Sequence, residues 1–197
     1  EELIYFITTQ VNYIMDNFAL SETTKAITEN IETAFHIAQS LDNVKTTLVR
    51  QLKSQLKIEL GSHEMTLLPD NDDVPNKFSI AFSTSPTQKF YLKFSFERKN
   101  FNGFVWGIIK QDSNYPSKEI CQKINTIMNE CFGVAENPNE WWPWSAWAET
   151  NNHFKNCLNW ERNPTPWLAI SDGSLVEEIV EIALKVKELF NSSDLLN

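Results

Sequence analysis

Apolar side chains recur every three or four residues through the first 61 residues, which is the spacing of an amphipathic helix. One run of this pattern covers residues 4–18, and a second covers residues 27–52 with Lys45 as its one polar member. The second run fits one long helix, or two helices separated at Asp42 and Asn43, which are good capping residues. In both forms the helix has an apolar face that needs a partner, either the protein core or a second copy in a coiled-coil dimer.

After residue 64 the spacing changes to an alternation of apolar and polar residues, the period of a β-strand. Three runs show it: residues 77–83, 90–96 and 104–108. Asn102 and Gly103, between the second and third runs, are typical of a hairpin turn. Residues 64–110 are therefore predicted to form an antiparallel meander with one buried aromatic face. The other face is expected to be polar and to include Ser79, Lys93, Ser95 and Glu97.

Helical spacing returns over residues 116–192. Pro116 and Gly133 mark the start and end of one predicted helix, and residues 174–177 form a capping box that starts a last helix. Prolines interrupt the stretch between these helices, which predicts short helical pieces and turns there. The three regions together predict a single α+β domain: an antiparallel sheet of three to five strands packed by amphipathic helices, with a tryptophan-rich helical C-terminal tail.

Six of the seven tryptophans lie between residues 141 and 167. An indole is large and rigid and its N–H needs a partner, so such a cluster either fills a core or builds a stacking surface. The aromatic face of the predicted sheet needs cover, which favours the core. Because adjacent side chains cannot all point the same way, we expect at least one of four indoles to reach the surface and to be a candidate ligand contact: Trp141, Trp142, Trp144 and Trp147.

The chain has 197 residues and a net charge of −9. This acidic balance argues against a nucleic-acid or anionic-membrane footprint over the whole surface, but it leaves room for a local basic patch. Three cysteines without metal-binding spacing are typical of reduced thiols. With no signal peptide and no membrane-spanning run, we expect a cytoplasmic protein without membrane association. The chain begins without Met inside a helical pattern, and we expect it to be a piece of a longer protein.

One set of residues fits the pattern of a metal-dependent nuclease. Asp70 follows a proline, and Glu97 and Lys99 follow later, as in the pattern P-D…(D/E)-x-K of a large nuclease superfamily. There the two acids hold Mg²⁺ and the lysine orients water or stabilises charge. Asp70, however, lies in an acidic loop, and Glu97 and Lys99 run into a hairpin where that superfamily has a helix. Catalysis by these three residues is therefore kept as an alternative, and no metal site or cofactor is predicted for this chain.

Four longer stretches resemble the C-terminal, non-catalytic half of a bacterial group of PD-(D/E)XK nuclease-like proteins. They are residues 28–41, 91–108 (Y-L-K-F-S-F-E-R-K-N-F-N-G-F-V-W-G-I), 141–144 (W-W-P-W) and 167–179. In that group a catalytic core is followed by a helical segment, then strands, then a tryptophan-containing helical tail. The resemblance covers most of the chain. It implies a Mg²⁺-dependent nuclease as the parent protein, with its metal-binding acids upstream, and it carries no catalytic residue over to this chain.

Basic side chains gather on the second helical run and around the predicted sheet. Together with one tyrosine, four of them are candidates for contacting a nucleic-acid backbone: Lys53, Lys57, Tyr91, Lys93 and Arg98. The leading hypothesis is therefore an accessory or substrate-recognition domain that acts on DNA without chemistry of its own. The alternatives are a minimal Mg²⁺-dependent nuclease, and a module for protein interaction or homodimerisation through the helical face.

Overall fold

The computed structural model describes residues 22–68, 79–83, 90–98, 101–110, 117–136, 138–151, 153–154, 157 and 160–193. The chain divides into two compact units, residues 1–45 and residues 46–197. The predicted helix over residues 4–18 and the proline at 116 lie outside the described residues. No described helix has the length and apolar character that crossing a membrane requires.

Most of the second helical run of the sequence forms one long helix, and its first residues belong to a shorter one. Helix α2 (Glu22–Glu29) ends at a turn on Asn30, and helix α3 (Ile31–Ser62) follows directly. The side-chain amide of Asn30 donates a hydrogen bond to the Ala26 carbonyl at 3.2 Å, which holds this turn. Helix α3 continues through Asp42 and Asn43, so the helix does not break at these capping residues.

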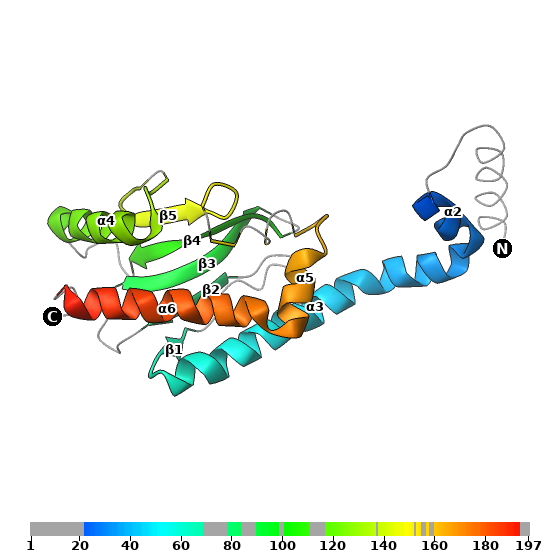
Figure 1. Ribbon diagram of the computed structural model, residues 1–197, viewed down its shortest axis with the longest axis horizontal. Helices are drawn as coiled ribbons and strands as arrows, with labels where there is room; N and C mark the ends of the chain where they lie inside the picture. Colours follow the sequence, from blue (N-terminus) through cyan, green and yellow to red (C-terminus); the bar gives the residue numbers. More distant parts are fainter. Residues whose placement is uncertain are drawn as a thin grey trace. The chain divides into compact units, whose positions relative to one another are not determined.

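The second unit contains an antiparallel sheet of five strands in the order β1-β2-β3-β4-β5, which is also their order along the chain. The strands are β1 (Thr66–Leu67), β2 (Ser79–Ser83), β3 (Phe90–Arg98), β4 (Asn102–Lys110) and β5 (Trp144–Trp147). This confirms the predicted α+β fold with an antiparallel meander (Figure 1). The β3–β4 hairpin is also confirmed, but Asn102 and Gly103 belong to β4, because Asn102 pairs with Arg98 and the turn precedes it.

Strand β5 is the element that the sequence analysis did not predict, since that stretch was expected to contain only helical pieces and turns. It pairs with β4 so that Gly107 lies opposite Ser145. A Cβ atom on Gly107 would lie 2.3 Å from the Trp144 carbonyl oxygen and 2.7 Å from the Ser145 Cα. The missing side chain therefore allows the backbone of β5 to approach β4 closely enough to pair.

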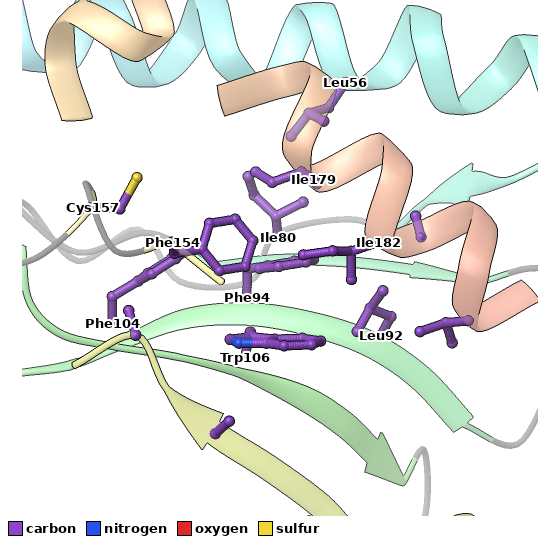
Figure 2. Close-up of a cluster of buried hydrophobic side chains, with 14 of the residues drawn as sticks. Leu56, Ile80, Leu92, Phe94, Phe104, Trp106, Phe154, Cys157, Ile179 and Ile182 are labelled. Carbon is purple, nitrogen blue, oxygen red and sulfur yellow. The ribbon is translucent and has the colours of Figure 1, made fainter. Parts of the chain in front are cut away.

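Three helices complete the second unit: α4 (Lys118–Phe132), α5 (Thr165–Asp172) and α6 (Ser174–Ser192). Figure 1 shows α6 running roughly along the strands of the sheet. In Figure 2, Ile179 and Ile182 of α6 point toward Phe94 and Leu92 of β3. Helix α4 reaches the same face of the sheet, because its Phe132 ring contacts the indole of Trp106 on β4 at a centroid distance of 5.3 Å.

The aromatic residues of that face form the core, as predicted. Trp106, Trp144 and Trp160 are fully buried. Phe94 stacks on Trp106 at 6.0 Å, and Phe96 meets the edge of Trp160 at 5.0 Å. Aromatic pairs of this geometry add stability beyond the area they bury. The tryptophan-rich tail thus covers the aromatic face that the strand pattern predicted.

Two local predictions were wrong. Ser95, expected on an exposed polar face, is buried, because its neighbours in the sheet, which include Val105, cover it. The predicted capping box at Ser174 does not form, since that residue is the first of α6 and makes no cap to it. Instead the Asp172 carboxylate accepts hydrogen bonds from both the Ser174 N–H and hydroxyl, and these bonds lower the pKa of Asp172. Gly133 ends α4, as predicted.

Candidate interaction surface

The residues of the nuclease pattern are only partly placed. Asp70 and Lys99 lie outside the described residues, and Glu97 is exposed near the end of β3. In the part of the chain that the structure describes, no three His, Cys, Asp or Glu side chains come close enough to hold a metal ion. Whether Asp70, Glu97 and Lys99 act together therefore remains a prediction.

The five side chains predicted to contact nucleic acid do not share one surface. Lys53 and Lys57 belong to α3, whose leucines join the core on the helical side of the sheet. Tyr91 and Lys93 alternate with the core residues of β3, so they point to the opposite side. Arg98 is exposed at the end of β3. Partial burial raises the pKa of the Tyr91 hydroxyl, and no described charge accounts for the shift.

The four indoles singled out in the sequence differ in exposure. Trp144 is fully buried, whereas the Trp141 side chain is 45 % exposed. Trp142 and Trp147 are half-buried. The Trp144 indole N–H donates to the side-chain oxygen of Asn129, at 3.1 Å, and also to the Gly133 carbonyl. Trp141 is therefore the indole that reaches the surface, as the sequence analysis expected of at least one.

The largest concentration of exposed apolar side chains lies on α2 and the first half of α3. Of the nine large apolar side chains that are exposed in the described part of the chain, five lie between Ile27 and Val44. We use the name α3 stripe for the apolar side chains on the first half of that helix. Steps of three, four and three residues place Ile31, Ala34, Ala38 and Leu41 along its centre, and its flanks are Phe35, Ile37 and Val44.

The degree of exposure distinguishes the α3 stripe from the core-facing leucines further along the helix. Phe35, Ile37 and Leu41 are 55, 64 and 45 % exposed, whereas Leu52 and Leu56, in the second unit, are fully buried in its core. The sequence pattern predicted the central line but missed the flanking residues Phe35 and Ile37. Both residues could have been recognised from the sequence, because they lie beside the central positions on the helix surface and widen the apolar face.

Charged groups on the first half of α3 are unequally distributed along its length. Glu32 lies in the first turn of the helix, and Lys45 lies at the end of the first unit. The Nε2 atom of His36 lies 4.0 Å from the Oε1 atom of Glu32. Because both side chains are well exposed, this contact adds little stability. Asp42 is also exposed and lies three residues before Lys45, so the first half of the helix has an acidic start and carries both signs of charge at its other end.

No protein-family model, no curated protein and no solved structure matches the chain significantly. The relationship to PD-(D/E)XK nuclease-like proteins, and with it a parent protein that uses Mg²⁺, therefore remains a prediction.

Proposed function

We propose that this chain is a self-association module that binds a second copy of itself through the α3 stripe. The observation that carries the proposal is the exposure of Phe35, Ile37 and Leu41 together on one helix. Most helix stability in proteins comes from packing of the apolar face, so an exposed apolar face on α3 favours a partner that covers it. A contiguous apolar patch on an otherwise polar surface marks an interaction site.

Sedimentation equilibrium across a wide range of protein concentration tests this proposal. We expect a reversible dimer with a dissociation constant in the micromolar range, on the order of −8 kcal/mol. The Leu41→Asp substitution loses about 1 kcal/mol of apolar burial per copy and adds the cost of burying two carboxylates. It should therefore weaken association by more than about 100-fold. Leu168→Asp is the control, because Leu168 is 63 % exposed and lies on α5.

A wild-type chain that stays monomeric at all concentrations would refute self-association and would mean that another segment or protein covers the α3 stripe. A dimer that Leu41→Asp and Leu168→Asp weaken equally would place the interface elsewhere.

Nucleic-acid recognition is a second candidate, favoured by one observation on the sheet. Tyr91 and Lys93 of β3 share a face with Trp147 of β5, because Lys93 pairs with Gly107 and Trp147 pairs with Val105. All three side chains are half-buried, and aromatic side chains beside a lysine can stack bases and contact phosphate. Binding of a single-stranded oligonucleotide at low salt, lost in Trp147→Ala with Trp141→Ala as control, would support it. No binding at low ionic strength would exclude it.

A further inference from the structure

A cleft that no sequence motif indicated lies between α4, the end of β4 and residues 138–143. Its volume is about 870 Å³, which is within the range of small-molecule sites. The walls are of mixed character: residues of α4 with amide, hydroxyl and thiol groups form one side, and Pro138, Asn139 and Pro143 form the other. The cleft belongs to the second unit alone and shares no residue with the α3 stripe.

Lys110 is the unusual member of the cleft. It is the last residue of β4, and only 8 % of its surface is exposed. Its backbone N–H donates to the Trp141 carbonyl oxygen at 3.0 Å, and this bond holds residues 138–143 against the end of the strand. By alternation its side chain lies on the same side of the sheet as Trp106 and Ile108, the side that α4 covers.

No partner for the Lys110 ammonium is present among the described residues. Glu140 is the one carboxylate among the described lining residues, and it is exposed and makes no ion pair with Lys110. The cleft is where the ammonium of this largely buried side chain can meet an anion, and an ammonium in a partly desolvated site attracts an anion more strongly than one in open water. A lysine that is more than nine-tenths buried and lines a cleft is therefore a strong sign that an anion binds there.

The surroundings of Lys110 favour a phosphate group. Lys118 lies at the exposed rim in the first turn of α4, so the positive end of that helix dipole also lies at the cleft. The wall is held in place by Asn125, whose amide donates to the Pro143 carbonyl at 2.9 Å and whose oxygen accepts from Asn129. A compact ammonium is a common phosphate ligand, and two of them suit a doubly charged group.

We propose that this cleft binds the phosphate group of a small polar molecule, with Lys110 as the buried counter-ion and Lys118 at the entrance. The volume exceeds that of a phosphate ion, so the remainder of the cleft accommodates the rest of the ligand. This inference is independent of self-association, because it concerns a different surface.

Cys121 provides a direct test, because it lines the same cleft. In a Cys131→Ala background the other remaining thiol is Cys157, which is buried, so a thiol reagent reports on Cys121. The probe is inorganic phosphate at constant ionic strength, with chloride as the comparison. At a dissociation constant of about 1 mM, 10 mM phosphate should slow labelling about tenfold. Lys110→Met should abolish this protection, and Lys110→Arg, which keeps the charge, should retain part of it.

Lys123→Met is the matched control, since Lys123 lies on α4 but donates to the Ser193 carbonyl at 2.8 Å and lies outside the cleft. Phosphate protection that survives Lys110→Met, or that is absent from the wild type, would overturn the proposal. A loss of protection in Lys123→Met equal to that in Lys110→Met would overturn it as well.

Discussion

Replacement of Asn129 by leucine tests the hydrogen bonds that join the end of α4 to β5. The side-chain oxygen of Asn129 accepts from the Trp144 indole at 3.1 Å and from the Ala135 N–H at 2.8 Å. Its amide donates to Asn125 at 2.8 Å. The Trp144 indole keeps its second acceptor, the Gly133 carbonyl, but the half-buried Ala135 N–H loses its partner.

An orphaned donor of this kind costs about 1–3 kcal/mol, and each remaining lost bond about 0.5–1.5 kcal/mol. We therefore expect Asn129→Leu to lower the free energy of unfolding by about 3 kcal/mol. For a chain of this size that corresponds to a fall in melting temperature of roughly 6–12 °C. Urea unfolding followed by tryptophan fluorescence measures the change, with an unaltered dependence on urea concentration.

Thr126→Val is the control for this measurement. Thr126 lies on the same helix and is exposed, and its hydroxyl donates to the Gln122 carbonyl at 3.1 Å. Such a bond contributes little to helix stability, so the change should stay below about 0.5 kcal/mol. If Asn129→Leu costs no more than Thr126→Val, then the contacts of Asn129 do not hold α4 to β5 and the reasoning is wrong.

Three further predictions follow from particular residues. Gly107→Ala should lower the free energy of unfolding in urea by about 3 kcal/mol or more and should expose Trp144 to quenchers, because the new Cβ would lie 2.3 Å from a β5 carbonyl oxygen. The control is Gly61→Ala, where the new Cβ has no atom within 4 Å. It should instead stabilise α3 by about 1 kcal/mol. Lys45→Leu replaces the one polar residue of the helical pattern by an apolar one, worth about 1 kcal/mol of burial per copy. It should therefore lower the dissociation constant of the dimer, measured by sedimentation, at least tenfold. An unchanged dissociation constant would mean that Lys45 lies outside the interface. Burial and the nearby Glu178 carboxylate raise the pKa of Cys157 from 9.0 to about 12, so its contribution to stability is complete below pH 9 and is lost as the pH rises toward 12. Over pH 9–12 the free energy of unfolding of the wild type should therefore fall more steeply than that of Cys157→Ala. The two slopes should differ by at most about 1.4 kcal/mol per pH unit. Equal slopes would contradict the assigned cause.

The sequence was sufficient to predict the features that depend on local patterns. Alternation along β3 and β4 predicted the aromatic core face, and the spacing of leucines predicted α3. The glycine at position 133 predicted the end of α4. In each of these cases the residues that define the element are neighbours in the chain, so their period is visible without knowledge of the fold.

The features that were missed depend on residues far apart in the sequence. Strand β5 forms because Gly107 leaves room for it, and no pattern within residues 144–147 indicates which strand it meets. Ser95 is polar but lies under its neighbours in the sheet. A lysine at the end of a strand is normally exposed. Here residues 138–143 cover Lys110, and the hydrogen bond from its backbone N–H to the Trp141 carbonyl holds them in place. Burial of these residues is a property of tertiary contacts, which a single sequence does not show.

The strand order of the sheet has a consequence for how the chain folds. Each strand pairs with the strand before it in the sequence, so the sheet is built without a crossover. The connection between β3 and β4 is short and loses little entropy on closure, so this hairpin forms from local contacts. The bond from Lys187 of α6 to the His63 carbonyl, by contrast, spans 124 residues. We therefore expect the β3–β4 hairpin to acquire protection from hydrogen exchange early in refolding, and the contact between α6 and the end of α3 to form last.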